Sequence, residues 1–304
     1  MNAQQGIFAL GTSEHAYLEF DLLAGVEPAR LVTAVVGLVE PLSTVGGVNL
    51  VVGFRPELWA EVGDPEEVPS EAHSWVEDLV GPDGFVMPAT QCDAWLWVAG
   101  GDRTAVFDNC RAVVSGLAGV AGLVRETTGW VYQHNRDLTG FVDGTENPSL
   151  LEAPQVATVP FGVPGAGSSV VLVQLWRHDS TQWDQLSEQQ QERVMGRTKP
   201  DSIELPEDGM PADSHVTRTV LEVDGEELEI FRRNVAYGGV SDHGTVFVGF
   251  SSDQWRLEEM LRRMVGAGDG IRCALTRYSQ PLTGGYHTVP TVEALARFAP
   301  PDQD

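Results

Sequence analysis

Residues 140–149 read GFVDGTENPS, and they lie between two halves of the chain that repeat one order of predicted elements. The stretch places Asp143 directly before Gly144 and ends in an Asn-Pro-Ser sequence. Asp-Gly and Asn-Pro pairs are typical of turns, because glycine tolerates a positive φ and proline fixes its own φ. On these residues alone, Asp143 is either a simple turn residue or a carboxylate that the turn holds in place for chemistry.

The first half predicts the order strand, helix, strand, strand, helix, strand. Its strand segments are β-rich or alternate in polarity, and its first helix begins at Pro28, a position that favours proline. The second helix ends in glycine. The predicted strands are 16–23, 48–54, 93–100 and 122–137, and the predicted helices are 28–42 and 102–119.

The second half repeats this order. Ser187 and Gln190 form a capping box at the start of a helix that runs to Met195 and ends at Gly196. A second, strongly patterned helix is followed by Gly266. The predicted strands are 168–179, 226–237, 244–250 and, with a Gly-rich bend, 271–290, and the patterned helix lies within the segment 251–268.

Two tandem β-α-β-β-α-β units indicate an α+β protein made of two ferredoxin-like halves. Helices would then cover one face of each antiparallel sheet. We place the N-terminal half at residues 1–139 and the C-terminal half at residues 140–304, so the turn with Asp143 lies at their join. Ligand sites favour such junctions, which adds weight to a functional role for Asp143.

The composition restricts the classes of function. Hydrophobic residues make up 42% of the chain and charged residues 21%, which suits a packed core. With 44 acidic and 19 basic residues, the net charge of -25 argues against a nucleic acid or an anionic membrane as the partner. We see no bilayer-spanning apolar run and no signal peptide, so we expect no membrane partner and a cytoplasmic location.

The sequence lacks the motifs of several common functional classes. Its three cysteines, Cys92, Cys110 and Cys273, are widely spaced without a CxxC pair, which disfavours a disulfide framework, a cysteine-rich metal site and covalent c-type haem. This cysteine usage fits a reducing compartment. GxSxG, GxxxxGK[ST], HExxH and a GxGxxG after a strand are also missing, so hydrolase, P-loop and Rossmann functions have no support.

The predicted strand 226–237 carries unusual polar residues. Alternate residues share a face, and one face begins aliphatic and ends with Arg232 and Asn234, so we expect it to point inward. A buried guanidinium needs an anionic or strongly accepting partner, so Arg232 belongs either to a structural ion pair or to a site. Arg233, on the more polar face, is predicted to be a solvated charge.

One of the seven histidines has a distinctive setting. His215 follows the loop-like segment LPEDGMPAD and precedes a β-rich run, so it is a plausible axial ligand on a loop. An isolated histidine is more often an ordinary surface or core residue, and spacing alone leaves both possibilities open. The candidates for a cofactor pocket are therefore Asp143, His215, Arg232 and Asn234.

GFVDGTENP resembles the signature of the dye-decolourising peroxidases, a family of haem peroxidases, and in particular their compact cytoplasmic branch (class B-like). The likeness extends to GIFALGTSEHAYLEFDL, GAGSSVVLVQLWRHD, LSEQQQERVMGRTK, DSHVTRT, FRRN and TVFVGFSSD, and so runs over most of the chain. The resemblance implies two ferredoxin-like halves, with non-covalent haem b mostly in the C-terminal one. It also implies His215 as the proximal iron ligand, with Asp143, Arg232 and Asn234 on the distal side.

The implied activity is a peroxidase that cleaves hydrogen peroxide heterolytically, leaves a ferryl haem and oxidises a small-molecule electron donor, such as a dye or a phenolic compound, by one-electron steps. Asp143 would move the proton or orient a water, and Arg232 would stabilise the developing charge and contribute more. Asn234 would hold a water or orient the peroxide. Arg197, in GRTK, is the candidate contact for a haem propionate. Phe250 either lines the distal face or belongs to the core.

One position departs from the family pattern. An acidic residue near the proximal histidine is expected in the run before the last strand, where this chain has Arg277 within CALTRYS. A carboxylate on the imidazole N–H would raise the basicity of the ligand, whereas an arginine cannot accept that proton. A backbone carbonyl, a water or another acid would have to replace it, which leaves the redox potential open.

Two other functions are weighed against the peroxidase. One is a haem-binding or haem-transfer protein with incidental peroxidase activity, and the other is a haem-free ferredoxin-like interaction module. We expect a homo-oligomer, which is common in the family. The tail APPDQD lacks the Leu/Ile/Gly-rich motif of capsid-targeted members, so we expect no encapsulin targeting.

Overall fold

The computed structural model describes residues 2–38 and 47–299. The end of the predicted helix 28–42 and all but the first residue of the tail APPDQD lie outside these ranges, so the expectation about encapsulin targeting falls on residues that are not described. Within the described ranges, no helix combines the length and the apolar composition needed to cross a bilayer.

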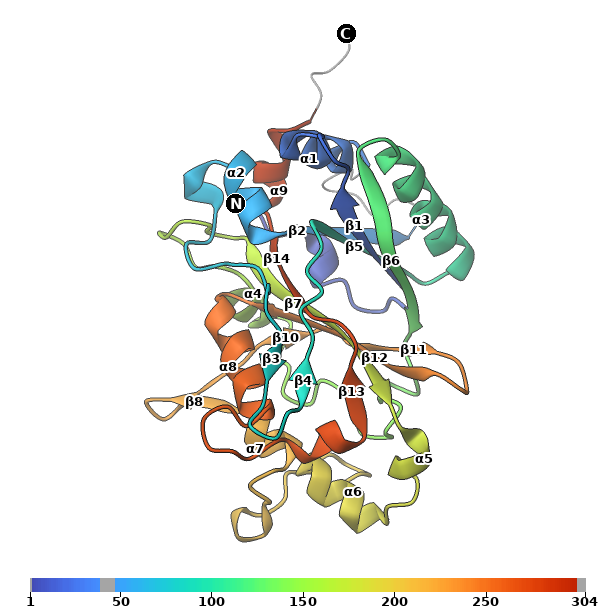
Figure 1. Cartoon of the computed structure of the whole chain (residues 1–304), viewed down its shortest axis with the longest axis vertical. Helices are drawn as coiled ribbons and strands as arrows, with labels where there is room; N and C mark the ends of the chain where they lie inside the picture. The colour runs from blue at the N-terminus through green and yellow to red at the C-terminus, as the bar shows by residue number, and fades with distance from the viewer. Residues whose placement is uncertain (1, 39–46, 300–304) are drawn as a thin grey trace.

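The first half is a four-stranded antiparallel sheet with two helices on one face (Figure 1). Its elements are β1 (Glu14–Leu22), α1 (Pro28–Val36), β2 (Val48–Phe54), β5 (Ala94–Gly100), α3 (Arg103–Leu117) and β6 (Ala121–Trp130). The sheet order β6-β1-β5-β2 places the fourth strand first, followed by the first, third and second. Helix α1 begins at Pro28 as predicted, because proline lacks only an N–H that the first turn leaves unpaired.

The second half repeats this order as β14-β7-β12-β11. Its elements are β7 (Ser169–His178), α5 (Ser180–Trp183), α6 (Glu188–Met195), α7 (His215–Thr219), β10 (Phe231–Arg232), β11 (Val235–Gly238), β12 (His243–Ser251), α8 (Gln254–Met264), β13 (Ser279–Pro281) and β14 (Gly285–Val289). The predicted capping box of α6 is confirmed, with Gly196 at φ 88° after its end. The prediction of two ferredoxin-like halves is therefore confirmed, while the boundary at residue 139 stays a prediction.

Shorter elements connect the two repeats. They are η1 (Gln5–Ile7), α2 (Pro56–Val62), η2 (Pro65–Glu67), β3 (Leu79–Val80), β4 (Val86–Met87), α4 (Ala153–Ala157), η3 (Glu207–Gly209), β8 (Leu221–Val223), β9 (Glu226–Leu228), η4 (Ala274–Arg277) and α9 (Val292–Ala296). Some of them cross between the halves, since Leu295 of α9 packs into the core of the first half and Met87 of β4 into that of the second.

The two sheets join into one closed circuit of hydrogen-bonded strands. Strand β11 pairs with β6 through Ala236 and Tyr237, and β14 pairs with β2 at Thr288. In the part of the chain that the structure describes, the circuit therefore runs through eight strands, and each of its pairings is antiparallel.

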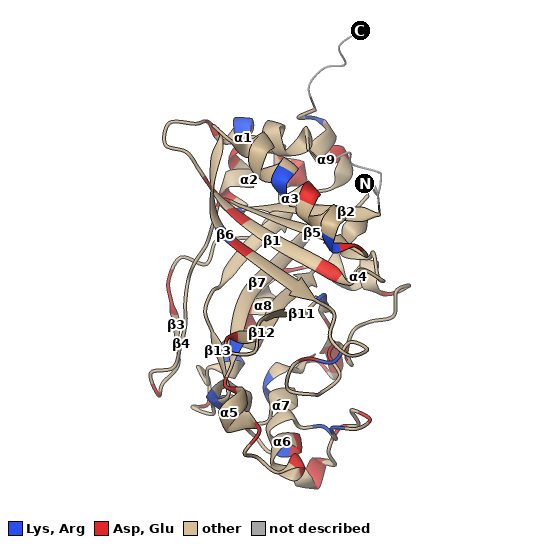
Figure 2. Cartoon of the chain, turned by 90° about the vertical axis from the view of Figure 1, so that its right-hand side faces the viewer, with Lys and Arg blue, Asp and Glu red and all other residues tan. Residues whose placement is uncertain are grey.

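Strand alternation sorts the side chains into three cores. In β5, Leu96 faces the core under α1 and α3, while Trp95 and Trp97 face a core between the two sheets. In β12, Phe250 faces the core between the sheets, whereas Phe247 packs against a third core under α8. Strands β5 and β12 are thus covered on both sides, and neither contains a Lys, Arg, Asp or Glu residue, so both are tan in Figure 2.

The structure corrects two expectations for residues 226–237. The segment is not one strand, because β9, β10 and β11 are separated by breaks. Arg233 is not a solvated charge, because its side chain points into the core between the sheets and only 8% of it is exposed. Its guanidinium donates to the backbone oxygens of Ile7 at 2.5 Å and Ala9 at 2.8 Å, and it lies 4.8 Å from the Trp97 ring centre.

The junction between β6 and β11 should be intolerant of added bulk. Gly129→Ala is expected to lower the free energy of unfolding by about 2 kcal/mol, as is typical when a packed site is overfilled. A Cβ at Gly129 would lie 2.6 Å from Val235 Cγ2 and 2.7 Å from the Ala236 oxygen. Gly122→Ala on the same strand is the control, since its nearest neighbour lies at 3.7 Å. Chemical denaturation that gives equal stability for both variants would contradict this prediction.

Candidate functional site

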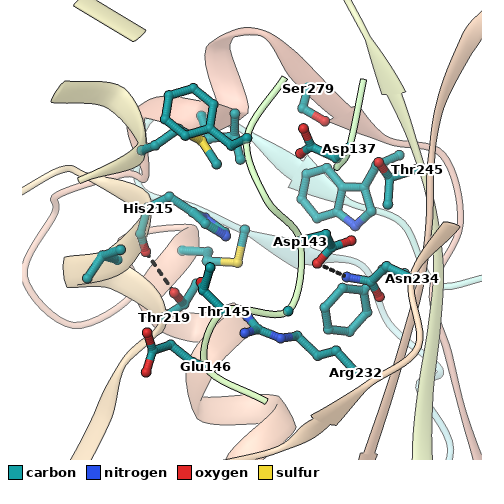
Figure 3. Close-up of a pocket in the computed structure, with 18 of the residues that line it drawn as sticks. Asp137, Asp143, Thr145, Glu146, His215, Thr219, Arg232, Asn234, Thr245 and Ser279 are labelled. Carbon is teal, nitrogen blue, oxygen red and sulfur yellow. Dashed lines mark hydrogen bonds between the residues drawn. The ribbon is translucent and has the colours of Figure 1, made fainter. Parts of the chain in front are cut away.

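A cavity lies in the second half, between the outer face of the sheet and helices α6, α7 and α8. His215 points into it from one side, and Asp143, Arg232 and Asn234 lie across from it (Figure 3). The apolar part of its wall includes Val216, Phe247, Met260, Leu261, Met264 and Leu275. The structure therefore brings together the four residues that the sequence selected as a cofactor pocket.

His215 is the first residue of helix α7, and not a loop residue as expected. Ser214 caps this helix by accepting a hydrogen bond from the Thr217 N–H at 3.2 Å. Burial, together with the positive charges of Arg232 and Arg197, lowers the pKa of His215 to about 4. The imidazole is therefore neutral at physiological pH, which is the form that binds a metal ion.

The partner of the His215 ring nitrogen Nδ1 is the sulfur of Cys273, at 3.5 Å. No sequence pattern indicates this contact, because the two residues lie 58 positions apart and a single cysteine has no motif. Burial raises the pKa of Cys273 to about 12, so its side chain is a neutral thiol. Arg277 is half exposed and pairs with Asp213 at 3.1 Å.

The turn at the join of the two halves positions Asp143. Gly144 adopts a φ of 76°, a conformation that favours glycine, and the Asp143 N–H donates to the Asn135 oxygen at 2.8 Å. Asn234 Oδ1 accepts from the Val248 N–H at 2.9 Å, which leaves its Nδ2 to donate to Asp143 Oδ1 at 3.1 Å. Asp143 thus shapes the bend and also presents its carboxylate to the cavity.

The pKa of Asp143 is raised above its ordinary value, although the influences on it oppose one another. Burial raises the pKa of its carboxyl group, while Arg232 and the hydrogen bond from Asn234 act in the opposite direction. A second carboxyl group, Asp137, also lines the cavity, and burial raises its pKa to about 6. Sequence reasoning missed Asp137, because nothing in the motif distinguishes it from a turn residue.

Asn147 links the turn to the strand that carries Arg232. Its side chain accepts from the Arg232 N–H and donates to the Arg232 oxygen, each at 2.8 Å. The N–H and the carbonyl oxygen of Arg232 are therefore both hydrogen-bonded to one side chain, an arrangement that we call the Asn147 clamp. The side chain of Arg232 extends toward the cavity (Figure 3). Arg232 Nε is buried and has no hydrogen-bond partner among the described residues. Sequence reasoning assigned Asn147 only to the turn.

Arg197 lies on the cavity wall one residue beyond Gly196. Its guanidinium pairs with Glu146 and Glu204, and its Nη1 donates to the Ser202 oxygen at 2.9 Å. The group is therefore well fixed, with only 12% of its side chain exposed. Its expected contact with a haem propionate stays a prediction.

Phe250 does not lie among the described residues that line the cavity. It packs between Trp95 and Trp97 in the core between the sheets, with ring centres 6.4 Å and 6.2 Å away. Phe247 lines the cavity instead, because residues three apart on a strand point to opposite faces. Of the two roles left open for Phe250, the structure favours the core.

A second cavity lies behind the group opposite His215. The two cavities share Asp137, Asp143, Gly144, Arg232 and Asn234 as a common wall. The far side of the second cavity is more polar and includes Thr12, His15, Asn135, Arg136 and Arg233. Asp137 and Asp143 therefore lie in the wall between a mostly apolar cavity, suited to a cofactor, and a more polar cavity, suited to small hydrophilic molecules.

Comparisons with known proteins agree on one family. Residues 134–294 match the model of the C-terminal part of the Dyp-type peroxidases. A dye-decolorizing peroxidase of Rhodococcus erythropolis is 37% identical over 84% of this chain and 75% of its own length, and one of Mycobacterium tuberculosis is 35% identical over 84% and 81%. Among solved structures, a DypB variant from Rhodococcus jostii in complex with haem has a TM-score of 0.86 and 33% identity, covering 93% of this chain and 94% of that one.

The neutral state of His215 can be measured directly in the haem-free protein. Its pKa is lowered from 6.5 to about 4, so the unfolded state binds more protons in this interval. The stability that the neutral ring contributes is therefore lost as pH falls from 6.5 toward 4. We expect the ¹H–¹⁵N NMR signals of this ring to stay in the neutral form at pH values above this range and throughout most of it. A titration midpoint at or above 6.5 would contradict the assignment.

Proposed function

The chain belongs to the Dyp-type peroxidase family and is a haem peroxidase, and from this premise we propose that hydrogen peroxide reacts in the cavity between His215 and the group of Asp143, Arg232 and Asn234. One observation carries this proposal. A neutral imidazole faces a carboxyl group, a guanidinium and an amide across a largely apolar cavity. Such a cavity offers one metal ligand on one side and groups for proton transfer and charge stabilisation on the other.

The cavity residues fit a haem. The neutral ring of His215 suits the iron, and the apolar wall suits the porphyrin. Arg197 would bind a haem carboxylate, and Phe247 would contact the ring system in place of Phe250. When bound, the haem supplies the redox centre at which peroxide is reduced and the donor is oxidised.

Asp143 is the proposed proton carrier. Its carboxylate accepts a proton from one oxygen of hydrogen peroxide and returns it to the other, so that this oxygen can leave as water. Burial supports this role, because it brings the pKa of Asp143 closer to the working pH. The hydrogen bond from Asn234 fixes the carboxylate during the transfer and lets Asn234 help to orient the peroxide.

Arg232 is the proposed source of charge stabilisation and the larger contributor. A guanidinium keeps its proton at any working pH, so it can stabilise negative charge on the departing oxygen without joining the proton transfer. The unpartnered Nε and the clamped backbone support this role, since the group is held in place and retains hydrogen-bonding capacity. The alternative of a structural ion pair has no partner in the structure, because no carboxylate of the described residues forms a salt bridge with Arg232 within 4 Å.

We also propose a class of reducing substrate, an oligomeric state and a cellular location. We infer a small-molecule electron donor, of the size of a phenol or a dye fragment, rather than a nucleic acid or a membrane lipid. The net charge of -25 supports this, because it repels polyanions. A homo-oligomer and a cytoplasmic location are part of the proposal, and sedimentation velocity and cell fractionation test them.

The ranking of the two distal residues is open to a kinetic test. Arg232→Ala should reduce the second-order rate constant for reaction with peroxide roughly 10³-fold, and Asp143→Asn roughly 10²-fold. Stopped-flow mixing of haem-loaded protein with peroxide measures this constant from the change in Soret absorption. Arg177→Ala is the control, because Arg177 is exposed and lies on β7 between two cavity residues. Parent-like kinetics of Arg232→Ala would reject the ranking.

The same experiment separates catalysis from haem carriage. A rapid and stoichiometric spectral change on mixing with peroxide supports the peroxidase, whereas slow bleaching of the Soret band supports a haem-transfer protein. Failure to take up haem would favour the haem-free interaction module.

Because Asn147 holds the backbone of Arg232, we expect the effects of substituting these two residues on the peroxide rate constant to be coupled. Asn147→Ala should lower the peroxide rate constant in the parent protein but have little further effect in the Arg232→Ala background. We expect a coupling energy of about 1–2 kcal/mol in a double-mutant cycle, because Asn147 acts through the position of Arg232. Fully additive effects of the two substitutions would show that Asn147 serves only the turn.

A further inference from the structure

We propose that Cys273 is a positioning residue for His215, and that its thiol sulfur accepts the hydrogen bond from the imidazole Nδ1–H. As a consequence, the histidine is a weaker electron donor to the iron than it would be with a carboxylate partner. This inference rests on the proposed function, because it takes His215 as the iron ligand.

The fold places the sulfur beside the ring with several backbone contacts. Cys273 is completely buried, and its Sγ lies 3.5 Å from His215 Nδ1. Its N–H donates to the Met264 oxygen at the end of α8 at 2.9 Å. The next N–H, of Ala274, donates to the Asp213 oxygen at 2.7 Å, two residues before His215. These bonds join the segment of Cys273 to the start of α7, so the contact is a fixed feature of the site.

The direction of the hydrogen bond follows from the ligand role. A neutral imidazole that binds iron through Nε2 keeps its proton on Nδ1, so Nδ1 is the donor and the sulfur must be the acceptor. A thiol sulfur is a weak acceptor. The bond therefore orients the ring but draws the Nδ1 proton only slightly toward the sulfur.

Two carboxylates from the segments that carry His215 and Cys273 are engaged elsewhere. Asp213 pairs with Arg277 at 3.1 Å, and Asp269 binds Arg218 through two hydrogen bonds of 2.7 Å and 3.0 Å. Arg277 thus replaces an expected acid and also holds the acid nearest to His215 in the sequence. The histidine is left with a neutral partner.

A neutral partner has a predictable effect on the iron. A carboxylate on the histidine N–H raises the basicity of the ligand and stabilises the ferric state. With a thiol in its place, the ferric state is less stabilised, and the ferric/ferrous midpoint potential is higher than with a carboxylate.

Spectroelectrochemical titration of the haem-loaded protein tests this inference without measuring catalysis. Cys273→Asp should shift the equilibrium at least tenfold toward the ferric state, which corresponds to a midpoint potential about 59 mV lower for a one-electron couple. Cys273→Ser should shift it in the same direction by less, because a hydroxyl oxygen is a better acceptor than sulfur. Cys110→Ser is the matched control, since Cys110 is also buried but lies on α3 in the first half.

A second comparison covers the case in which a buried aspartate prevents folding. Cys273→Ala removes the acceptor, so its potential should lie above that of Cys273→Ser, and the iron–histidine stretching frequency of the ferrous form should fall. Equal potentials and equal frequencies in the parent, Ser and Ala variants would overturn the inference. The same conclusion would follow if Cys273→Asp bound haem with the parent potential.

Failure of the inference can be distinguished from failure of the proposed function by His215→Ala. Loss of the histidine-ligated haem spectrum in this variant, together with unmoved potentials in the Cys273 variants, would reject only the role of Cys273. Retention of that spectrum would reject His215 as the ligand, and the role of Cys273 would fall with it.

Discussion

The closed circuit of strands constrains the rest of this structure. Because helices cover the outer faces and the two sheets cover each other, each central strand must present side chains suited to two different interiors. Neighbouring residues of one extended segment can therefore serve entirely different purposes. Arg232 points into the cavity, while Arg233 points into the core between the sheets and satisfies backbone oxygens near the N-terminus. The same alternation separates Phe247 from Phe250.

The group of Asp143, Arg232 and Asn234 opposite His215 depends on contacts between segments far apart in the chain. The turn at 140–149 contributes Asp143 and Asn147, and the second half contributes Arg232 and Asn234. Asn147 fixes the backbone of Arg232, and Asn234 fixes the carboxylate of Asp143. Two amide side chains thus hold one carboxyl group and one guanidinium at the same wall, which keeps the site preorganised.

The surroundings of His215 set the chemistry that the haem can support. Burial and two nearby guanidinium groups keep the imidazole neutral, and a neutral thiol replaces the carboxylate partner that the family pattern suggests. Asp213 and Asp269, from the segments that carry His215 and Cys273, pair with Arg277 and Arg218. The proposed site therefore combines a distal group suited to peroxide reduction with a histidine ligand that we infer to be of modest basicity.

The sequence by itself determined the two repeats, the helix start at Pro28, the capping box at Ser187 and four residues of the site, because these depend on local periodicity, turn chemistry and a contiguous motif. The tertiary structure alone decided that Arg233 is buried and that Phe247, not Phe250, lines the cavity. The burial of each face of a strand depends on the elements that pack against it, and the sequence of the strand does not specify them. The tertiary structure also decided the roles of Asn147 and Cys273. Their partners lie 85 and 58 positions away, and no local pattern encodes contacts between segments that only the closed circuit brings together.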